Sequence, residues 1–175
     1  MRKKSGQGRV IWKPFLFVCS ILATLLVWGS AQPAVRVQPT DSVGPRTLEK
    51  QTETAVIRDY LQAWQSLSGA LDQNRPELLN RDFVGTAKEK LADTIREQSK
   101  LGIQTRYQDG KHDIQLVFYS PEGLSIQLVD TVEYDVQLLD HEKLLITRHV
   151  RARYVAVLTP TEVQWKVRVF QAEPE

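Results

Sequence analysis

Residues 124–158 read LSIQLVDTVEYDVQLLDHEKLLITRHVRARYVAVL, and this stretch carries the strongest signal for the fold. On both sides of the DHEK segment, apolar residues alternate with polar ones at a spacing of two. That spacing places all the apolar side chains on one face of a β-strand. The stretch therefore predicts two long neighbouring strands of an antiparallel sheet that has one dry and one wet face.

The alternation also assigns residues to the two faces. The dry face is expected to carry Leu124, Ile126, Leu128, Val132, Tyr134, Val136, Leu138, Leu144, Ile146, Val150, Ala152, Tyr154, Ala156 and Leu158. The wet face carries a basic stripe, defined here as His149, Arg151, Arg153, Lys166 and Arg168. The bland interpretation of this stripe is a solvated surface balanced by Glu133 and Asp135 on the next strand. The alternative is a surface that docks another protein.

Further strands are predicted at 103–107, 112–119 and 162–172, joined by the turn signals QDGK, SPEG and TPTE. Before Gly102 the period is 3.6, which is typical of amphipathic helices. A long helix is expected over 48–72, a short one from Pro76 through Leu79, and a third from an N-cap at Thr86 to a stop at Gly102. The fold class is therefore α+β, with three helices packed on one face of a curved antiparallel sheet.

The N-terminal part of the chain has the pattern of an export signal. Residues 1–13, MRKKSGQGRVIWK, form a basic tail, and 15–28, FLFVCSILATLLVW, are densely apolar. An uncleaved membrane anchor over 14–31 and a signal peptide cleaved after Ala31 both fit this pattern. Either way, the positive charges indicate that the tail is cytoplasmic and the rest is outside the cytoplasm. We expect a single-pass inner-membrane protein, or an exported soluble protein if the segment is cleaved.

Residues 32–46 contain three prolines and no apolar period, which predicts a linker before a single domain over 47–175. The net charge of +2 comes from the tail, because its five basic residues leave 18 − 21 = −3 for the rest of the chain. A slightly acidic domain is not expected to bind nucleic acid. The single Cys19 cannot form an intramolecular disulfide, and the sequence has neither metal-ligand spacing nor a phosphate loop, so no metal or cofactor is expected.

Three segments give the chain a family resemblance: VIRDYLQAWQSL at 56–67, LLNRDFVG at 78–85 and VQWKVRVFQ at 163–171. Over residues 47–171 the chain resembles nuclear transport factor 2-like domains, which are cone-shaped α+β domains. The resemblance implies an isomerase-like or dehydratase-like enzyme, a ligand binder or a non-catalytic association domain. With its tail and apolar segment, the chain also looks like the inner-membrane scaffold subunit of type IV secretion systems.

Four polar residues interrupt the predicted dry face, namely His112, Asp130, Tyr134 and Arg148. If Gly123 forms a bulge, Ile114 lies opposite Asp130, and His112 lies diagonal to that carboxylate and within its reach. The imidazole could then act as a base that the carboxylate orients. The structural alternative is an exposed histidine and a carboxylate at a bulge or rim. Arg148 is expected near Tyr134, where it either packs on the ring or binds a ligand carboxylate.

Five aromatic residues could line a small-molecule pocket or simply fill the core: Tyr60, Trp64, Tyr134, Tyr154 and Trp165. The leading hypothesis is a membrane-tethered association domain without catalytic activity. We expect it to form a homodimer or bind a protein partner through the wet face, where Val155, Val157 and Phe170 would supply burial. The alternative is a pocket enzyme or small-ligand binder of the same fold, which a pocket holding His112, Asp130 and a tyrosine would favour.

Overall fold

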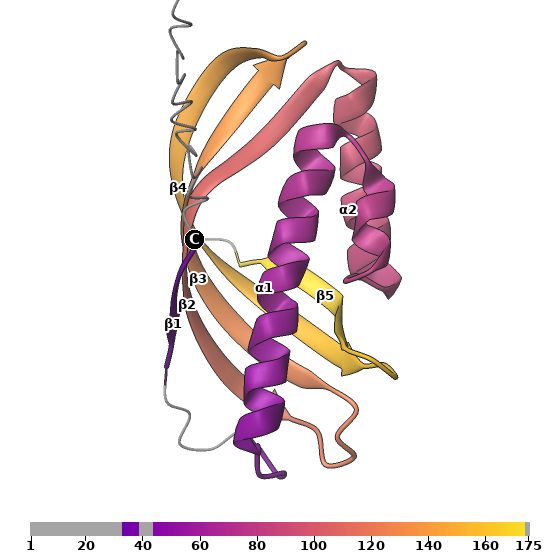
Figure 1. The fold of residues 1–175 in the computed structure, drawn as a ribbon, viewed down its shortest axis with the longest axis vertical. Coiled ribbons are helices and arrows are strands. Elements are labelled where there is room, and N and C mark those ends of the chain that lie inside the picture. Colours follow the sequence, from indigo (N-terminus) through magenta and orange to yellow (C-terminus); the bar gives the residue numbers. More distant parts are fainter. Residues whose placement is uncertain (1–32, 39–43, 174–175) are drawn as a thin grey trace, which may run out of the picture. The chain divides into compact units, whose positions relative to one another are not determined.

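The structure, a computed structural model, describes residues 33–38 and 44–173, all within one compact unit (Figure 1). The predicted basic tail, apolar segment and cleavage site lie outside these residues. Among the helices that are described, none is long and apolar enough to cross a membrane.

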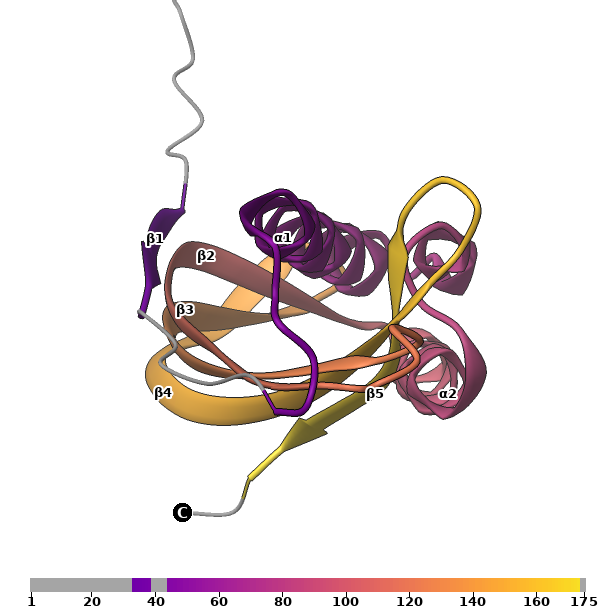
Figure 2. The same ribbon diagram turned by 90° about the horizontal axis from the view of Figure 1, so that it is seen from below.

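Five strands form one sheet in the order β1-β2-β3-β4-β5. Their bounds are β1 Ala34–Val37, β2 Ile103–Tyr119, β3 Ile126–Asp140, β4 Lys143–Pro160 and β5 Trp165–Ala172. The sheet curls around the helices, which lie on its concave side (Figures 1 and 2). Strands β2 to β5 are antiparallel to their neighbours, whereas β1 runs parallel to β2. The expected α+β class is confirmed, but the sheet is mixed rather than purely antiparallel.

The helices are α1 (Lys50–Gln73), a 3₁₀ helix η1 (Pro76–Asn80) and α2 (Gly85–Lys100). The second of the three predicted helices is thus a single 3₁₀ segment, because five residues beginning at a proline are too few for an α-helix. Thr86 is not an N-cap. The cap is Val84, whose N–H donates to the Val167 carbonyl at 2.9 Å, so a backbone contact with β5 sets the start of α2. Gly102 follows the last turn at φ +69°, as predicted.

The predicted turn at QDGK is a β-bulge within one continuous strand. Gln108 pairs with Asp135 and Lys111 with Glu133, so β2 carries one residue more than β3 across this interval. An extra residue bends a strand without ending it. The 103–107 and 112–119 segments therefore belong to the single strand β2.

The prediction that 32–46 is a linker is wrong for its first residues, because Ala34–Val37 form β1 at the edge of the sheet. The Gln38 N–H donates to the Ile114 carbonyl at 2.9 Å, and the Gln38 side-chain amide donates to Asp113 Oδ2 at 2.9 Å. Alternating valines in AVRV favour an extended strand, and this preference outweighs the flanking prolines.

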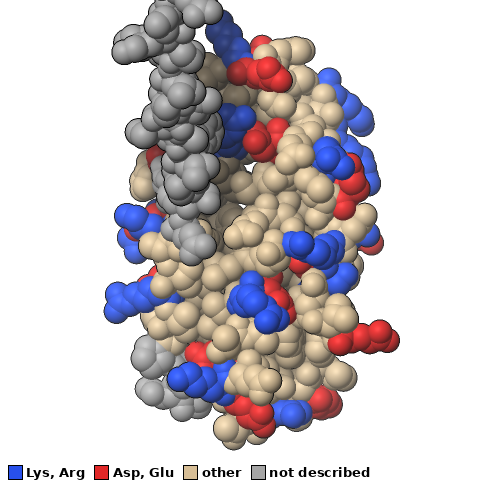
Figure 3. Space-filling model, in the orientation of Figure 1, with Lys and Arg blue, Asp and Glu red and all other residues tan. Residues whose placement is uncertain are grey.

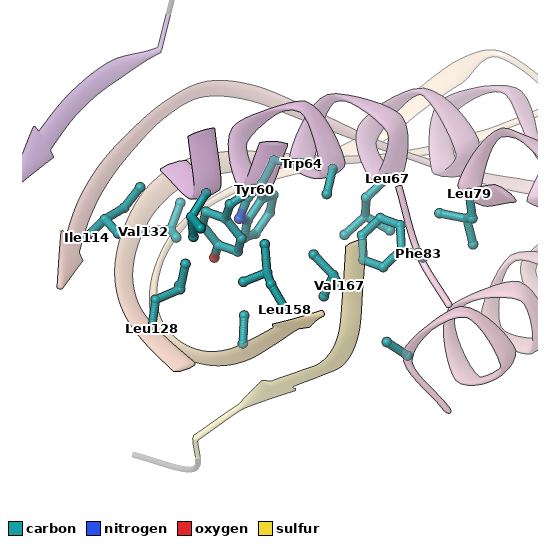
Figure 4. Packing of buried hydrophobic residues seen from close by; sticks show 14 of the residues in the cluster. Tyr60, Trp64, Leu67, Leu79, Phe83, Ile114, Leu128, Val132, Leu158 and Val167 are labelled. Atoms are coloured by element: carbon teal, nitrogen blue, oxygen red, sulfur yellow. The ribbon is translucent and has the colours of Figure 1, made fainter. Parts of the chain in front are cut away.

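The dry face holds where the helices cover it, and the core formed there includes Tyr60, Trp64, Ile114 and Leu128 (Figure 4). At the ends of the strands, next to the turns, residues predicted for the dry face are exposed. Leu144 and Ile146 are 51% and 45% exposed, and Leu124 is 62% exposed.

Val157 of β4 pairs with Val169 of β5, whereas Leu158, the next residue of β4, pairs with Val167. The register between the two strands therefore shifts at Arg168. Because of this shift, the partly buried Phe170 packs against the core, and its ring stacks on that of Tyr154 with 4.9 Å between the ring centroids. Phe170 is therefore not a wet-face residue.

Candidate functional site

A network of three polar side chains lies inside the core, one each from α1, β2 and β3. Asp130 Oδ2 accepts a hydrogen bond from the Tyr60 hydroxyl at 2.9 Å and lies 2.7 Å from His112 Nδ1. All three side chains are buried, Tyr60 and Asp130 completely. Ile114 pairs with Asp130 and His112 with Val132, so the histidine lies diagonal to the aspartate as predicted. The bulge that sets this register is at Val117, between Leu116 and Phe118, and not at Gly123 as the prediction assumed.

The carboxylate of Asp130 fixes the orientation of the imidazole. Because a carboxylate only accepts hydrogen bonds, Nδ1 of His112 carries the proton in this contact. In the neutral ring Nε2 then has a free lone pair. Burial, and next the negative charge of Asp130, raise the pKa of Tyr60 well above its ordinary value. Tyr60 therefore stays a hydroxyl donor to the carboxylate.

His112 reaches the wall of a small pocket, whereas Asp130 and Tyr60 lie behind that wall. The pocket has a volume of about 170 Å³ and opens to solvent between α1 and β2. Its walls consist of Pro33, Leu61, Trp64, Gln65, Ser68, Tyr107, Gln108, Gly110, His112, Val132 and Tyr134. The arrangement presents one imidazole nitrogen to a ring-lined space.

Trp64 is the centre of an aromatic cluster that fills the interior beside this pocket. Its ring lies within about 6 Å of the rings of Tyr107, His112, Tyr134, Tyr154 and Phe170. The hydroxyls of Tyr134 and Tyr154 are hydrogen-bonded at 2.8 Å. Burial raises the pKa of both Tyr107 and Tyr134 above the ordinary tyrosine value. These residues mainly fill the core, as the plainer of the two sequence interpretations expected.

Two of the predicted site residues lie elsewhere. Trp165 packs edge-on against Tyr119 at 6.4 Å, and its backbone N–H donates to Asp59 at 2.8 Å. Arg148 is exposed on β4 opposite Val136, because the strands extend past the helices at this level. Neither residue is among those that line the pocket.

The basic stripe is largely paired with acids of its own chain. His149 meets Asp135 at 2.8 Å, Arg151 meets Glu133 at 3.6 Å, and Arg153 meets Glu173 at 2.9 Å. Figure 3, which presents the side of α1 and not the stripe, shows Lys and Arg interspersed with Asp and Glu there too. The stripe therefore matches the solvated surface of the bland interpretation.

Sequence reasoning missed an exposed apolar surface at the β3–β4 hairpin, which lies at the upper end of the sheet in Figure 1. We call it the hairpin patch, and its members are Leu101, Leu144, Leu145 and Ile146, which are 74%, 51%, 56% and 45% exposed. The His141 N–H donates to the Gly102 carbonyl at 3.2 Å. This hydrogen bond brings Leu101, which precedes Gly102, close to the hairpin. The signal was present in the sequence, since three consecutive apolar residues after a turn break the alternation.

Within residues 33–38 and 44–173, no group of three metal-ligating side chains occurs. No family model matches the sequence, and no curated protein matches it. Among solved structures, the intermembrane space region of the chloroplast protein ARC6 is similar, with a TM-score of 0.57 and 15% identity over 74% of this chain and all of that one. A protein assigned as a scytalone dehydratase from Novosphingobium aromaticivorans has a TM-score of 0.51 and 16% identity, over 72% of this chain and 89% of that one.

At these identities the similarities show the fold alone. Together with the observed topology, they place the described unit in the nuclear transport factor 2-like fold. The fold expected from the resemblance is thereby confirmed, and the chemistry has to be argued from the residues of this chain.

Proposed function

We propose that this chain is a membrane-tethered association domain without catalytic activity, displayed on the extracytoplasmic side, and that two copies associate through the hairpin patch. The observation that carries the proposal is the exposure of Leu144, Leu145 and Ile146 at the end of the β3–β4 hairpin, where Leu145 is a bulge residue without a pairing partner on β3. Contiguous exposed apolar residues on a soluble domain mark an interaction surface more often than single ones do.

The rim of the patch favours a second copy of this chain as the occupant. Lys100 and Lys143 lie beside it in the sequence, and so does Glu142. A surface that carries both signs of charge around an apolar centre can complement itself across a two-fold axis. The wet face of the sheet is less suited to this role, because Glu133 and Asp135 are already paired within the chain.

The interior of the cone supports a role in association rather than in turnover of a large substrate. Trp64 and the rings around it occupy the space between α1 and the sheet. The remaining pocket of about 170 Å³ is smaller than the roughly 300–1,000 Å³ that ligand sites commonly have.

The tether and its direction follow from the sequence, in which five basic residues precede an uncharged stretch over 15–35. The similar region of ARC6 is, by its name, located in an intermembrane space. A domain held outside the cytoplasm by one N-terminal segment would present its hairpin patch to another copy in the same membrane.

The alternative function, a pocket enzyme or small-ligand binder such as an isomerase or dehydratase, is favoured by one specific observation. His112, oriented by Asp130, stands at the wall of the pocket. In an enzyme its free Nε2 would take a proton from the substrate.

The proposal is tested by sedimentation equilibrium of the full chain in density-matched detergent. The wild type should sediment as a dimer and Leu145→Lys as a monomer, because the new charge would be buried in the contact. Leu124→Lys, at an exposed leucine near the opposite end of β3, is the matched control and should remain dimeric. A monomeric wild type, or a Leu145→Lys variant that still dimerises, would overturn the proposal.

A further inference from the structure

We propose that the pocket beside His112 binds a small neutral molecule made of one planar ring with a hydrogen-bond donor, and that this donor bonds to Nε2 of His112. Phenols are the simplest members of this class. The inference concerns binding only, and it stands independently of association through the hairpin patch.

The size of the pocket limits the ligand to one ring. A cavity of about 150 Å³ in another protein accommodates benzene, and this pocket has about 170 Å³. Trp64, Tyr107 and Tyr134 contribute ring surfaces to its walls, while Leu61 and Val132 add aliphatic ones. A flat ring would contact these surfaces by stacking and edge contacts.

The charge of the lining indicates a neutral ligand. Among the side chains that the structure describes, which exclude that of Asp109, no Lys, Arg, Asp or Glu lines the pocket, and the polar groups besides His112 are amides, hydroxyls and the indole N–H of Trp64. A carboxylate or phosphate would lose its hydration there without gaining an ion pair from an arginine or lysine.

His112 supplies the specific hydrogen bond. Its ring is only 6% exposed, yet Nε2 forms no hydrogen bond with any residue that the structure describes. Nε2 lies 3.6 Å from the position that a Cβ at Gly110 would occupy, and both residues line the pocket.

The network behind the pocket makes this acceptor rigid. Asp130 Oδ2 lies 2.7 Å from His112 Nδ1, and the same oxygen accepts a hydrogen bond from the Tyr60 hydroxyl at 2.9 Å. The lone pair of Nε2 is therefore aimed before a ligand arrives, which lowers the entropic cost of binding.

The test is a titration of the full chain, labelled with ¹⁵N-histidine and held in detergent micelles, with phenol. The His112 Nε2 resonance should shift saturably. The resonances of His141 and His149 should not, and these are internal controls because both rings are exposed and also hold Nδ1 against an aspartate. Anisole, which has the same ring and no donor, should bind about tenfold more weakly.

Two variants that fill the pocket, Gly110→Val and Ser68→Phe, should each abolish the His112 response. Either one suffices if it retains the wild-type near-ultraviolet circular dichroism. Equal affinities for phenol and anisole would show that the hydrogen bond to Nε2 does not contribute to binding, and would overturn the proposal. A His112 resonance that phenol does not move, or that moves only linearly together with those of His141 and His149, would overturn it as well.

Discussion

Two aspartates on β3 make the same contact in opposite environments. Asp130 and Asp135 each lie within 2.8 Å of a histidine Nδ1 on a neighbouring strand. Asp130 is completely buried and also accepts from Tyr60, whereas the His149 side chain beside Asp135 is 69% exposed. The free energy of each contact should therefore be set by burial and not by distance.

We expect Asp130→Ala to lower the free energy of unfolding by about 3 kcal/mol, because Tyr60 and His112 are left buried without their acceptor. Asp135→Ala should cost less than about 1 kcal/mol, since water replaces the lost partner. Urea unfolding followed by tryptophan fluorescence measures both values. Equal losses would show that the buried network contributes nothing special to stability.

The buried tyrosines predict a loss of stability in alkali. Tyr60 has a pKa raised above the ordinary 10.0, so above pH 10 the unfolded chain loses a proton that the folded chain keeps. Stability from this residue is fully present below pH 10 and falls by about 1.4 kcal/mol per pH unit above it, until the folded hydroxyl ionises. The fall in the free energy of unfolding between pH 9 and 11 should be shallower for Tyr60→Phe. Parallel curves for the two proteins would contradict this expectation.

At the level of elements, local signals predicted most of the fold, and the failures lie where long-range pairing decides. The period of two in residues 124–158 placed β3 and β4, because one slip would have exposed every apolar residue. The Ile114–Asp130 pairing needed an extra residue as well, which was assumed at Gly123 and lies at Val117. An Asp-Gly pair such as that in QDGK suits a turn as well as a β-bulge. Only the pairing of both flanking segments with β3 shows that it is a bulge.

The candidate site was predicted in the same uneven way. Asp130 and His112 share a face by alternation alone, so their contact was predictable. Tyr60 reaches Asp130 from α1, across 70 residues of sequence, and no periodicity predicts that a helix lies over a particular carboxylate. Phe170 was misplaced because the bulge at Arg168 shifts the alternation of β5 by one residue.

Strand β1 provides a test of element pairing. The Gln38 N–H donates to β2, so the N–H of Arg36, two residues earlier, faces β2 as well, and that of Val35 faces away. Arg36→Pro should therefore detach β1, whereas Val35→Pro should leave it paired. Amide hydrogen exchange measures this as lost protection of the β2 amides that face β1. Loss of protection in both variants, or in neither, would contradict the pairing.

For the whole molecule, β1 changes the expected relation between segment and domain. Only residues 32 and 33 separate the end of the apolar segment, predicted at residue 31, from the first strand of the sheet. The 32–46 stretch is thus not one free spacer, since β1 belongs to the domain.

We expect the mature protein to retain residues 1–31 and to stay with membranes after a carbonate wash, because the uncharged stretch over 15–33, which precedes β1, is within the length range that spans a bilayer. Mass spectrometry of the purified chain gives its first residue. Protease added to spheroplasts should degrade the domain. A mature chain that begins at Gln32, or a domain that resists protease in spheroplasts, would contradict this arrangement.

Disulfide crosslinking in native membranes tests the central claim, association of two copies through the hairpin patch, most directly. In a Cys19→Ser background, Leu145→Cys would place one thiol of each copy beside the two-fold axis, and mild oxidation should give a covalent dimer. Leu124→Cys is the control, because this leucine is also exposed but lies near the opposite end of β3. We expect a dimer for Leu145→Cys and none for Leu124→Cys. Absence of a dimer for Leu145→Cys, or equal dimer yields at both positions, would contradict it.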